Sequence, residues 1–113
     1  MLKPSRLFVA IEPIDLRKGM DSLMVLARQT GRDVFDDRAA WVFRNRSGSR
    51  LKMVYWDGLG FWLCVRRLDR GRFHWPDTSD ALFELTPEQF AWFVDGIDWR
   101  RLDKDQRVLA SAY

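Results

Sequence analysis

The feature that most constrains the fold of this chain is a series of short strand-like runs separated by glycine turns in its middle third. Turn sequences occur at Ser47-Gly48, Asp57-Gly58 and Asp69-Arg70-Gly71. Glycine and Asp-Gly supply the positive φ angles that tight hairpins need, and short connections join neighbouring antiparallel strands. The pattern therefore predicts a β-meander with strands over about residues 41–46, 50–56, 61–68 and 72–75.

The segment before this meander predicts one further strand and one helix. The apolar run from Leu7 to Ile11 is typical of a strand. Asp15 is a candidate helix cap, because its carboxylate can accept from the unpaired backbone N–H groups of a first turn. Apolar residues follow at helical spacing up to Ala27, and Gly31 is the expected end of the helix. A helix from Asp15 to Gly31 is therefore expected.

The segment after the meander predicts a second helix. Thr86 as cap, Pro87 at the first position and Gln89 at the third form a strong helix start. A chain of 113 residues with 47% hydrophobic residues suits one domain with a real core. We predict a single α+β domain over residues 1–113: an antiparallel meander of about four to five strands with an N-terminal and a C-terminal helix. Its core spans about residues 7–101, and residues 102–113 form a flexible or helical tail.

Positive charge is concentrated in the meander. Residues 44–72 hold eight basic residues against only Asp57 and Asp69, which gives this segment a net charge of +6. The whole chain is +3, so the remainder sums to −3. A clustered basic surface with aromatic residues among the cations is the usual footprint of a polyanionic partner.

Strand alternation predicts how these residues divide between two faces of the sheet. Ten apolar residues fall on the expected core face: Trp41, Phe43, Leu51, Met53, Tyr55, Phe61, Leu63, Val65, Phe73 and Trp75. The expected outer face carries Val42, Arg44, Arg46, Arg50, Lys52, Val54, Trp56, Trp62, Cys64, Arg66, Arg72 and His74. Six of the eight cations thus share one side. Arg67 breaks the alternation, which predicts a bulge near residues 66–68.

A basic sheet face of this kind predicts contact with nucleic-acid phosphates. The candidate nucleic-acid-binding residues are Arg44, Arg46, Arg50, Lys52, Trp56, Trp62, Arg66 and Arg72. Trp56 and Trp62 are candidates for stacking on splayed bases. Two alternatives stay open: the face is a solvated outer surface whose charges prevent edge association, or the two tryptophans are buried under the C-terminal helix.

Nothing in the sequence demands catalysis, a metal or a cofactor. His74 is the only histidine and lacks an orienting partner, so we interpret it as a partly exposed strand residue. The turn at Asp57-Gly58 precedes a strand, so it is a hairpin turn and not a nucleotide-binding loop. A single cysteine, Cys64, excludes internal disulfides and suits a reduced compartment. With no signal-peptide core and no long apolar stretch, a cytoplasmic protein is expected.

Several strings together resemble a known family. They are Asp15-Leu16-Arg17-Lys18-Gly19, Phe43-Arg44-Asn45-Arg46, Tyr55-Trp56-Asp57-Gly58, Gly60-Phe61-Trp62 and Gly71-Arg72-Phe73-His74-Trp75-Pro76. Over about residues 7–101 the chain resembles the TnpB accessory proteins of insertion-sequence family sixty-six, which are unrelated to the RNA-guided nuclease of the same name. The resemblance implies participation in transposition alongside a separate DDE-type transposase of the same element. It implies no set of catalytic residues.

The leading hypothesis is a non-enzymatic accessory protein that binds the DNA of the element ends and assists this transposase. An alternative is a protein–protein adaptor for the transposase with little DNA contact, motivated by Trp92 and Trp99 outside the clear core pattern. A third, a divergent metal-dependent nuclease, would need two or more carboxylates that converge on Mg²⁺. No small-molecule substrate and no membrane partner are expected.

Overall fold

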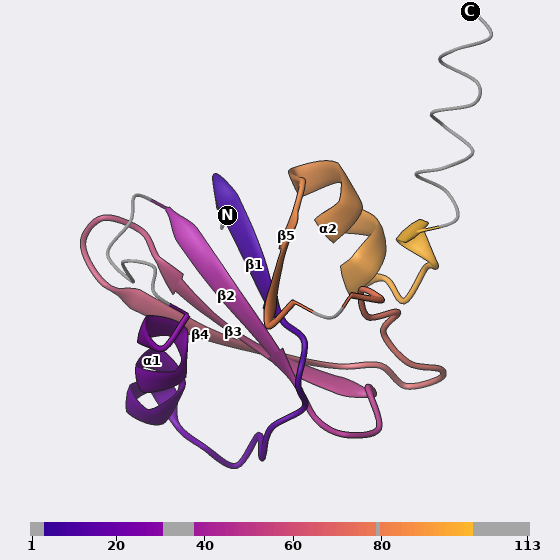
Figure 1. The fold of residues 1–113 in the computed structure, drawn as a ribbon, viewed down its shortest axis with the longest axis horizontal. Coiled ribbons are helices and arrows are strands. Elements are labelled where there is room, and N and C mark those ends of the chain that lie inside the picture. The colour runs from indigo at the N-terminus through magenta and orange to yellow at the C-terminus, as the bar shows by residue number, and fades with distance from the viewer. Residues whose placement is uncertain (1–3, 31–37, 79, 101–113) are drawn as a thin grey trace, which may run out of the picture.

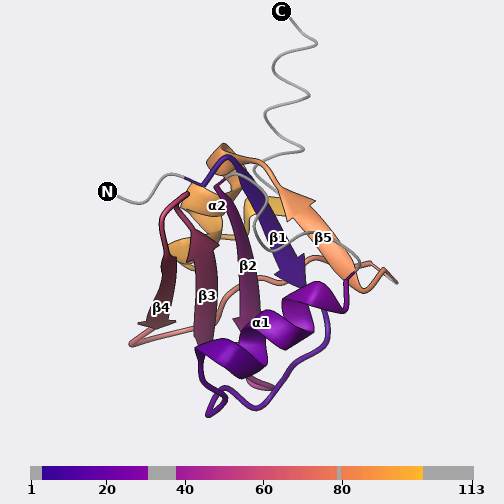
Figure 2. The same cartoon turned by 90° about the vertical axis from the view of Figure 1, so that its left-hand side faces the viewer.

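The computed structural model describes residues 4–30, 38–78 and 80–100. They form one five-stranded sheet with a helix on each face, which confirms an α+β domain (Figures 1 and 2). The elements in chain order are β1 (Arg6–Ala10), α1 (Met20–Arg28), β2 (Ala39–Arg44), β3 (Arg50–Trp56), β4 (Phe61–Arg67), β5 (Leu82–Leu85) and α2 (Pro87–Val94). Within the described residues, neither helix is long and apolar enough to span a membrane.

The sheet is mixed, so the prediction of a purely antiparallel meander is wrong. The strand order is β4-β3-β2-β1-β5, and β1 pairs with β2 in parallel, Phe8 opposite Trp41. The remaining pairs are antiparallel. A parallel pair needs a crossover connection, and α1 lies on the chain between these two strands. Only β2, β3 and β4, over residues 39–67, form the predicted antiparallel meander, because short turns join these three strands.

The fifth strand was not predicted from the sequence, and one predicted strand is absent. β5 pairs with β1 at the edge of the sheet. Residues 72–75 are not a strand, although Phe73 and Trp75 are buried as expected. Hydrogen bonds hold this segment: the Phe73 amide donates to the Gly48 carbonyl (2.8 Å), the Trp75 indole donates to the Ala10 carbonyl (2.7 Å), and the His74 and Trp75 carbonyls accept from Trp99 and Arg100. Side-chain burial here therefore comes from a tethered coil.

The N-terminal helix starts later than its sequence predicts. The Asp15 carboxylate accepts from the Arg17 amide (2.9 Å) and pairs with the Arg17 guanidinium (2.7 Å), so it stabilises a turn that precedes the helix. α1 begins at Met20, with Gly19 as a cap that has no side-chain hydrogen bond. It ends at Arg28, and the predicted end at Gly31 lies outside the described residues.

The C-terminal helix starts where its sequence predicts. The Gln89 amide donates to the Thr86 hydroxyl (3.1 Å), and the Thr86 amide donates to the Gln89 side-chain carbonyl (2.9 Å). Pro87 occupies the first turn. This reciprocal pair is a capping box, which satisfies two N–H groups that a helix start otherwise leaves unpaired. The predicted tail over residues 102–113 lies outside the described residues.

One helix covers each face of the sheet (Figure 2), and each face has its own core. The face toward α2 carries alternate strand residues together with Phe73, Trp75, Phe93 and Trp99. The opposite face packs against α1 through Phe8, Leu16, Leu23, Ala27, Ala39, Trp41, Phe43 and Val54. A sheet buried on two sides explains how a short chain uses so many aromatic residues. It also leaves no broad open face on β1 or β2.

Candidate nucleic-acid interface

The strand register overturns the prediction that six cations share one face. Residues directly opposite in a ladder lie on the same face of a sheet. Lys52 lies opposite Phe43, which packs in the α1 core, whereas Arg44 lies opposite Leu51, which packs in the α2 core. The strand cations therefore divide between faces: Arg44 and Arg66 on the α2 side, Arg50, Lys52 and Arg67 on the α1 side.

The physical reason lies in the turns. Alternation fixes the faces within one strand, but the length of each connection fixes how two strands are matched. The β3–β4 register runs without offset from Trp56 opposite Phe61 to Arg50 opposite Arg67. The predicted bulge near residues 66–68 is therefore wrong, and Arg67 follows the normal alternation of β4. The first turn likewise places Arg44 opposite Leu51.

The eight cations instead gather at one end of the sheet, which we call the basic end. β2 ends there at Arg44, β3 begins there at Arg50, and β4 ends there at Arg67. The turn and the loop at this end carry the others, and the basic end comprises Arg44, Arg46, Arg50, Lys52, Arg66, Arg67, Arg70 and Arg72. The charge cluster found in the sequence is thus real, but its surface is an end and not a face.

The two candidate stacking residues lie at the other end. Trp56 ends β3 six residues after Arg50, which is about 20 Å at the usual rise of a strand. Trp56 packs on Phe61 at 4.8 Å between ring centroids, and Trp62 lies on the opposite face, across from Tyr55. Trp62 is 50% exposed, so α2 does not bury it. The structure therefore does not bring either tryptophan to the arginines.

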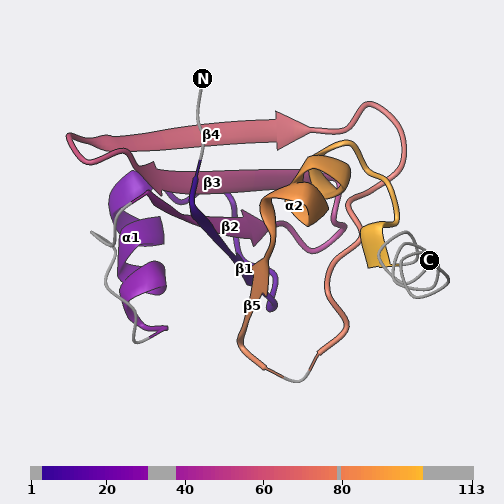
Figure 3. The same ribbon diagram turned by 90° about the horizontal axis from the view of Figure 1, so that it is seen from above.

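The basic end contains a hollow that we call the arginine pocket. Its volume is about 210 Å³, and four arginines and the only histidine line it: Arg44, Arg46, Arg72, Arg100 and His74. Ser47, Gly48, Phe73 and Trp75 complete the lining. Figure 3 shows the segment after α2 beside the loop that follows β4, and this placement brings Arg100 to the pocket.

Two of the four pocket arginines are held in place. The Arg44 guanidinium donates twice to the Ile11 carbonyl (2.9 and 3.2 Å) and lies 5.2 Å from the Trp75 ring centroid. Arg100 donates to the Trp75 carbonyl (3.2 Å) and to the Asp98 carboxylate (3.1 Å). Burial lowers the pKa of Arg44, and the nearby Glu12 carboxylate opposes this effect. These contacts fix the two guanidinium groups before any ligand arrives.

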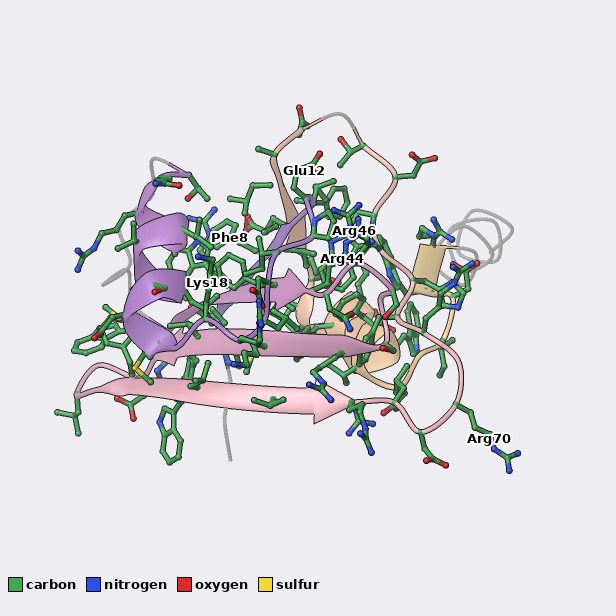
Figure 4. The ribbon with its side chains drawn as sticks, turned by 90° about the horizontal axis from the view of Figure 1, so that it is seen from below. Phe8, Glu12, Lys18, Arg44, Arg46 and Arg70 are labelled. Carbon is green, nitrogen blue, oxygen red and sulfur yellow. The ribbon has the colours of Figure 1, made fainter. Side chains whose placement is uncertain are left out.

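The other two pocket arginines are exposed. Figure 4 shows Arg46 beside Arg44 at the end of β2, with Arg70 extending away on the loop after β4. Among the described residues, neither Arg46 nor Arg72 has a hydrogen bond or an ion pair through its side chain. Their donors are open to a ligand. Sequence reasoning named both residues, but it set His74 aside and missed Arg100, which lies far from the meander in sequence.

Three of the six candidate cations have side-chain contacts within the described protein that the charge count did not reveal. Besides Arg44, Lys52 donates from Nζ to the Lys18 carbonyl (3.1 Å). Arg66 donates to the Val94 carbonyl near the end of α2 and pairs with Asp95 at 3.5 Å. A cation at the carbonyl end of a helix is favourably placed against the helix dipole. Arg66 therefore fastens α2 to the edge strand.

Two further hollows extend the basic end beyond the arginine pocket. One, of about 310 Å³, is lined by Pro13, Ile14, Asp15 and Arg46, and so adjoins the arginine pocket through Arg46. The next, of about 440 Å³, shares Asp15 and is lined also by Leu16, Arg17, Asn45, Arg50, Lys52 and Val65. The shared lining residues Arg46 and Asp15 make the three hollows neighbours of one another. The Arg17 guanidinium holds the pKa of Asp15 well below its usual range, so that carboxylate is ionised.

The comparisons with known proteins identify the family. The family model of IS66 Orf2-like proteins matches residues 5–104. The chain belongs to this family. Two relatives from Sinorhizobium fredii (strain NBRC 101917 / NGR234) are named only as uncharacterized proteins. The protein y4jC is 36% identical over 110 residues, covering 92% of each chain, and y4hO is 39% identical over 95 residues, covering 84% of this chain and 83% of its own. No solved structure matches.

In this IS66 Orf2-like chain, the other groups that could bind a metal ion or react are the carboxylates, such as Asp57, and the Cys64 thiol. The described residues contain no group of three or more His, Cys, Asp or Glu side chains suited to a metal ion. Asp57 accepts from the amides of Leu59 and Gly60 and from the Trp62 indole, all at 2.8 Å, and these bonds lower its pKa. The predicted hairpin turn is confirmed. Burial raises the pKa of the Cys64 thiol, which disfavours the nucleophilic thiolate.

Proposed function

We propose that this chain is a non-enzymatic accessory protein of transposition that binds the DNA of its element through the basic end and assists the element's DDE-type transposase in the cytoplasm. Membership of the IS66 Orf2-like family supports an association with transposition. The observation that carries DNA binding is the arginine pocket with its neighbouring hollows. They line up cations from four separate segments of the chain along one end of the sheet.

The arrangement suits a phosphate backbone for an electrostatic reason. Exposed charges act together only when they lie within about a Debye length, roughly 8–10 Å at physiological salt. The ladder pairs put the strand cations within a few residues of one another at the same end. Six of the eight cations of the basic end are exposed, and Arg66 is engaged with Val94 and Asp95. Five are therefore available for phosphates: Arg46, Arg50, Arg67, Arg70 and Arg72. Five phosphate contacts predict that log affinity falls with log salt at a slope of about −4.5.

The test is a titration of duplex DNA from the element ends, followed by fluorescence anisotropy across a salt series. The variant carrying Arg46→Gln, Arg50→Gln and Arg72→Gln should weaken binding and make the slope shallower by about 2.7, because each phosphate contact contributes about 0.9. Arg46→Gln alone should make the slope shallower by about 0.9, and Arg28→Gln, which removes one exposed charge from the last turn of α1, is its matched control. Absent or salt-independent binding by the folded wild-type protein would reject the proposal.

The protein–protein adaptor remains the second candidate, but on a different surface from the one its sequence suggested. Trp99 is 4% exposed and donates to the His74 carbonyl (2.7 Å), and Trp92 packs against the α2-side core. Three of the five large apolar residues that are exposed instead lie along one edge of the sheet: Trp62 and Val65 on β4, an edge strand, and Leu59 in the turn before it. If Trp62→Ser and Val65→Ser together abolish transposase capture while DNA binding persists, this edge carries the contact.

A further inference from the structure

We infer that the arginine pocket is a site for a phosphomonoester, namely the terminal phosphate of a nucleic-acid strand, and not only another contact for internal phosphates. The inference rests on the proposed function for the source of the phosphate. It rests on the pocket itself for the chemistry. Three features of the pocket support it: its size, its formal charge and the fixed position of half of its donors.

The size of the pocket suits a single anionic group. Pockets that enclose a small-molecule ligand usually measure about 300–1,000 Å³. The arginine pocket, at about 210 Å³, is smaller than this range. A whole nucleotide would not be enclosed, whereas a phosphate at the end of a strand can enter while its sugar and base stay outside. The four guanidinium groups come from three segments of the chain: the end of β2 with its turn, the loop after β4, and the segment after α2.

The charge of the pocket matches a dianion. Its four arginines contribute +4, and two carboxylates lie against them: Asp98 on Arg100 and Glu12 near Arg44. The formal remainder is +2. A phosphomonoester carries −1.5 to −2 at neutral pH and offers three acceptor oxygens. An internal phosphodiester carries only −1. A terminal phosphate therefore neutralises the pocket, and an internal phosphate leaves it charged.

The four pocket arginines keep N–H donors that can bind a phosphate. Each guanidinium has five N–H donors, and Arg44 and Arg100 use only part of theirs on the carbonyls and the carboxylate that hold them. Arg46 and Arg72 have no side-chain partner within the described ranges. A ligand thus meets two fixed guanidinium groups and two that can close on it. Bidentate arginine–phosphate pairs are among the stronger charge-assisted hydrogen bonds.

Hydrogen bonds join the segments that line the pocket. Gly48 lines it with φ at +74°, and its carbonyl accepts from the Phe73 amide at 2.8 Å. This hydrogen bond ties the turn between β2 and β3 to the loop that carries Arg72. The Trp99 indole donates to the His74 carbonyl and ties the segment after α2 to the same loop. All three segments that supply pocket arginines are therefore joined by hydrogen bonds.

The experiment compares one oligonucleotide with four different ends: 5′-hydroxyl, 5′-phosphate, 5′-phosphate capped as its methyl ester, and 3′-phosphate. Fluorescence anisotropy at one salt concentration gives the four affinities. We expect a terminal phosphate to tighten binding at least tenfold over the hydroxyl, and the methyl ester to lose most of that gain because it carries one charge fewer. The 5′ and 3′ arms show which end the pocket prefers.

Matched variants assign the effect to the pocket. Arg46→Gln with Arg72→Gln should bring the ratio of phosphorylated to unphosphorylated affinity close to one. Arg70→Gln removes a charge from the same loop, outside the pocket lining, and should keep the wild-type ratio even where overall affinity falls. The ratio separates a specific site from general attraction, because losing one exposed charge weakens all four oligonucleotides alike.

The possible results separate this inference from the proposed function. If wild-type protein binds all four oligonucleotides equally, the phosphomonoester site is rejected and DNA binding stands. If no oligonucleotide binds, the proposed function fails, and thermal unfolding with thymidine 5′-monophosphate decides the inference. A rise in Tm that needs Arg46 and Arg72 would then support a phosphomonoester site for free nucleotides. No rise would overturn it.

Discussion

Replacing Arg44 by lysine separates the structural contacts of this residue from its charge. The substitution keeps the positive charge at the end of β2. It removes the paired N–H donors that bond the Ile11 carbonyl and the planar group that lies over Trp75. Lysine is a flexible point charge, and it reproduces neither the fork nor the stacking. Sequence reasoning grouped Arg44 with the phosphate-binding residues, whereas its contacts with Ile11 and Trp75 predict that it also stabilises the fold.

The magnitude follows from these contacts. A hydrogen bond from a charged donor contributes about 1.5–3 kcal/mol, and lysine recovers part of this by a single contact. A cation–π contact at a partly exposed site contributes about 0.5–1 kcal/mol. We therefore expect Arg44→Lys to lower the free energy of unfolding by about 2 kcal/mol. For a domain of this length, that loss lowers Tm by roughly 8 °C.

Thermal unfolding followed by circular dichroism measures this change, and DNA titration measures affinity. Arg46→Lys is the matched control. Because Arg46 is exposed, the free energy of unfolding of this variant should stay within about 0.5 kcal/mol of wild type. The DNA salt slope of Arg44→Lys should equal that of wild type below its Tm. An unchanged Tm, or a large loss of DNA affinity without loss of stability, would refute the structural role assigned to Arg44.

Two further predictions concern the turn and the cap that position the sheet and α2. Thr86→Ala removes the hydroxyl that accepts from the Gln89 amide, so urea unfolding should show a loss of about 1 kcal/mol. Asp57 has a lowered pKa in the folded protein, so its stabilising effect is present above the unfolded pKa of about 3.9 and is lost as pH falls through the folded value. Stability measured from pH 5 to pH 2.5 should therefore decline less steeply for Asp57→Asn than for wild type; equal slopes would contradict this.

Local sequence signals were reliable where one short segment decides the structure. The capping box at Thr86 and Gln89 and the hairpin turn at Asp57 formed as predicted, because each involves contacts within five residues. The helix expected at Asp15 failed for an equally local reason. Arg17 binds the Asp15 carboxylate, and the helix begins only at Met20. Competition between two local uses of one side chain is hard to read from spacing alone.

The errors in the fold and the site come from long-range pairing. No local sequence signal near Leu7 predicts that β1 pairs with β2 in parallel. None predicts that residues 82–85 form a strand on the other side of β1. The same limit affected the cations. Alternation placed Lys52 and Arg44 on one face, but the register between β2 and β3 places them on opposite faces. Charge counting found the correct segment, and only the register showed that its surface is an end of the sheet.

The parallel pairing of β1 with β2 also explains why the arginine pocket forms at this end. The two strands finish side by side, so the carbonyl of Ile11, just after β1, reaches the guanidinium at the end of β2. Sites in sheets with parallel strands commonly lie beyond the carboxyl ends of those strands. Arg100 then closes the pocket from beyond α2 through the Trp75 carbonyl. The pocket needs residues from near both ends of the described chain, so its phosphate chemistry depends on the completed fold and not on the basic segment alone.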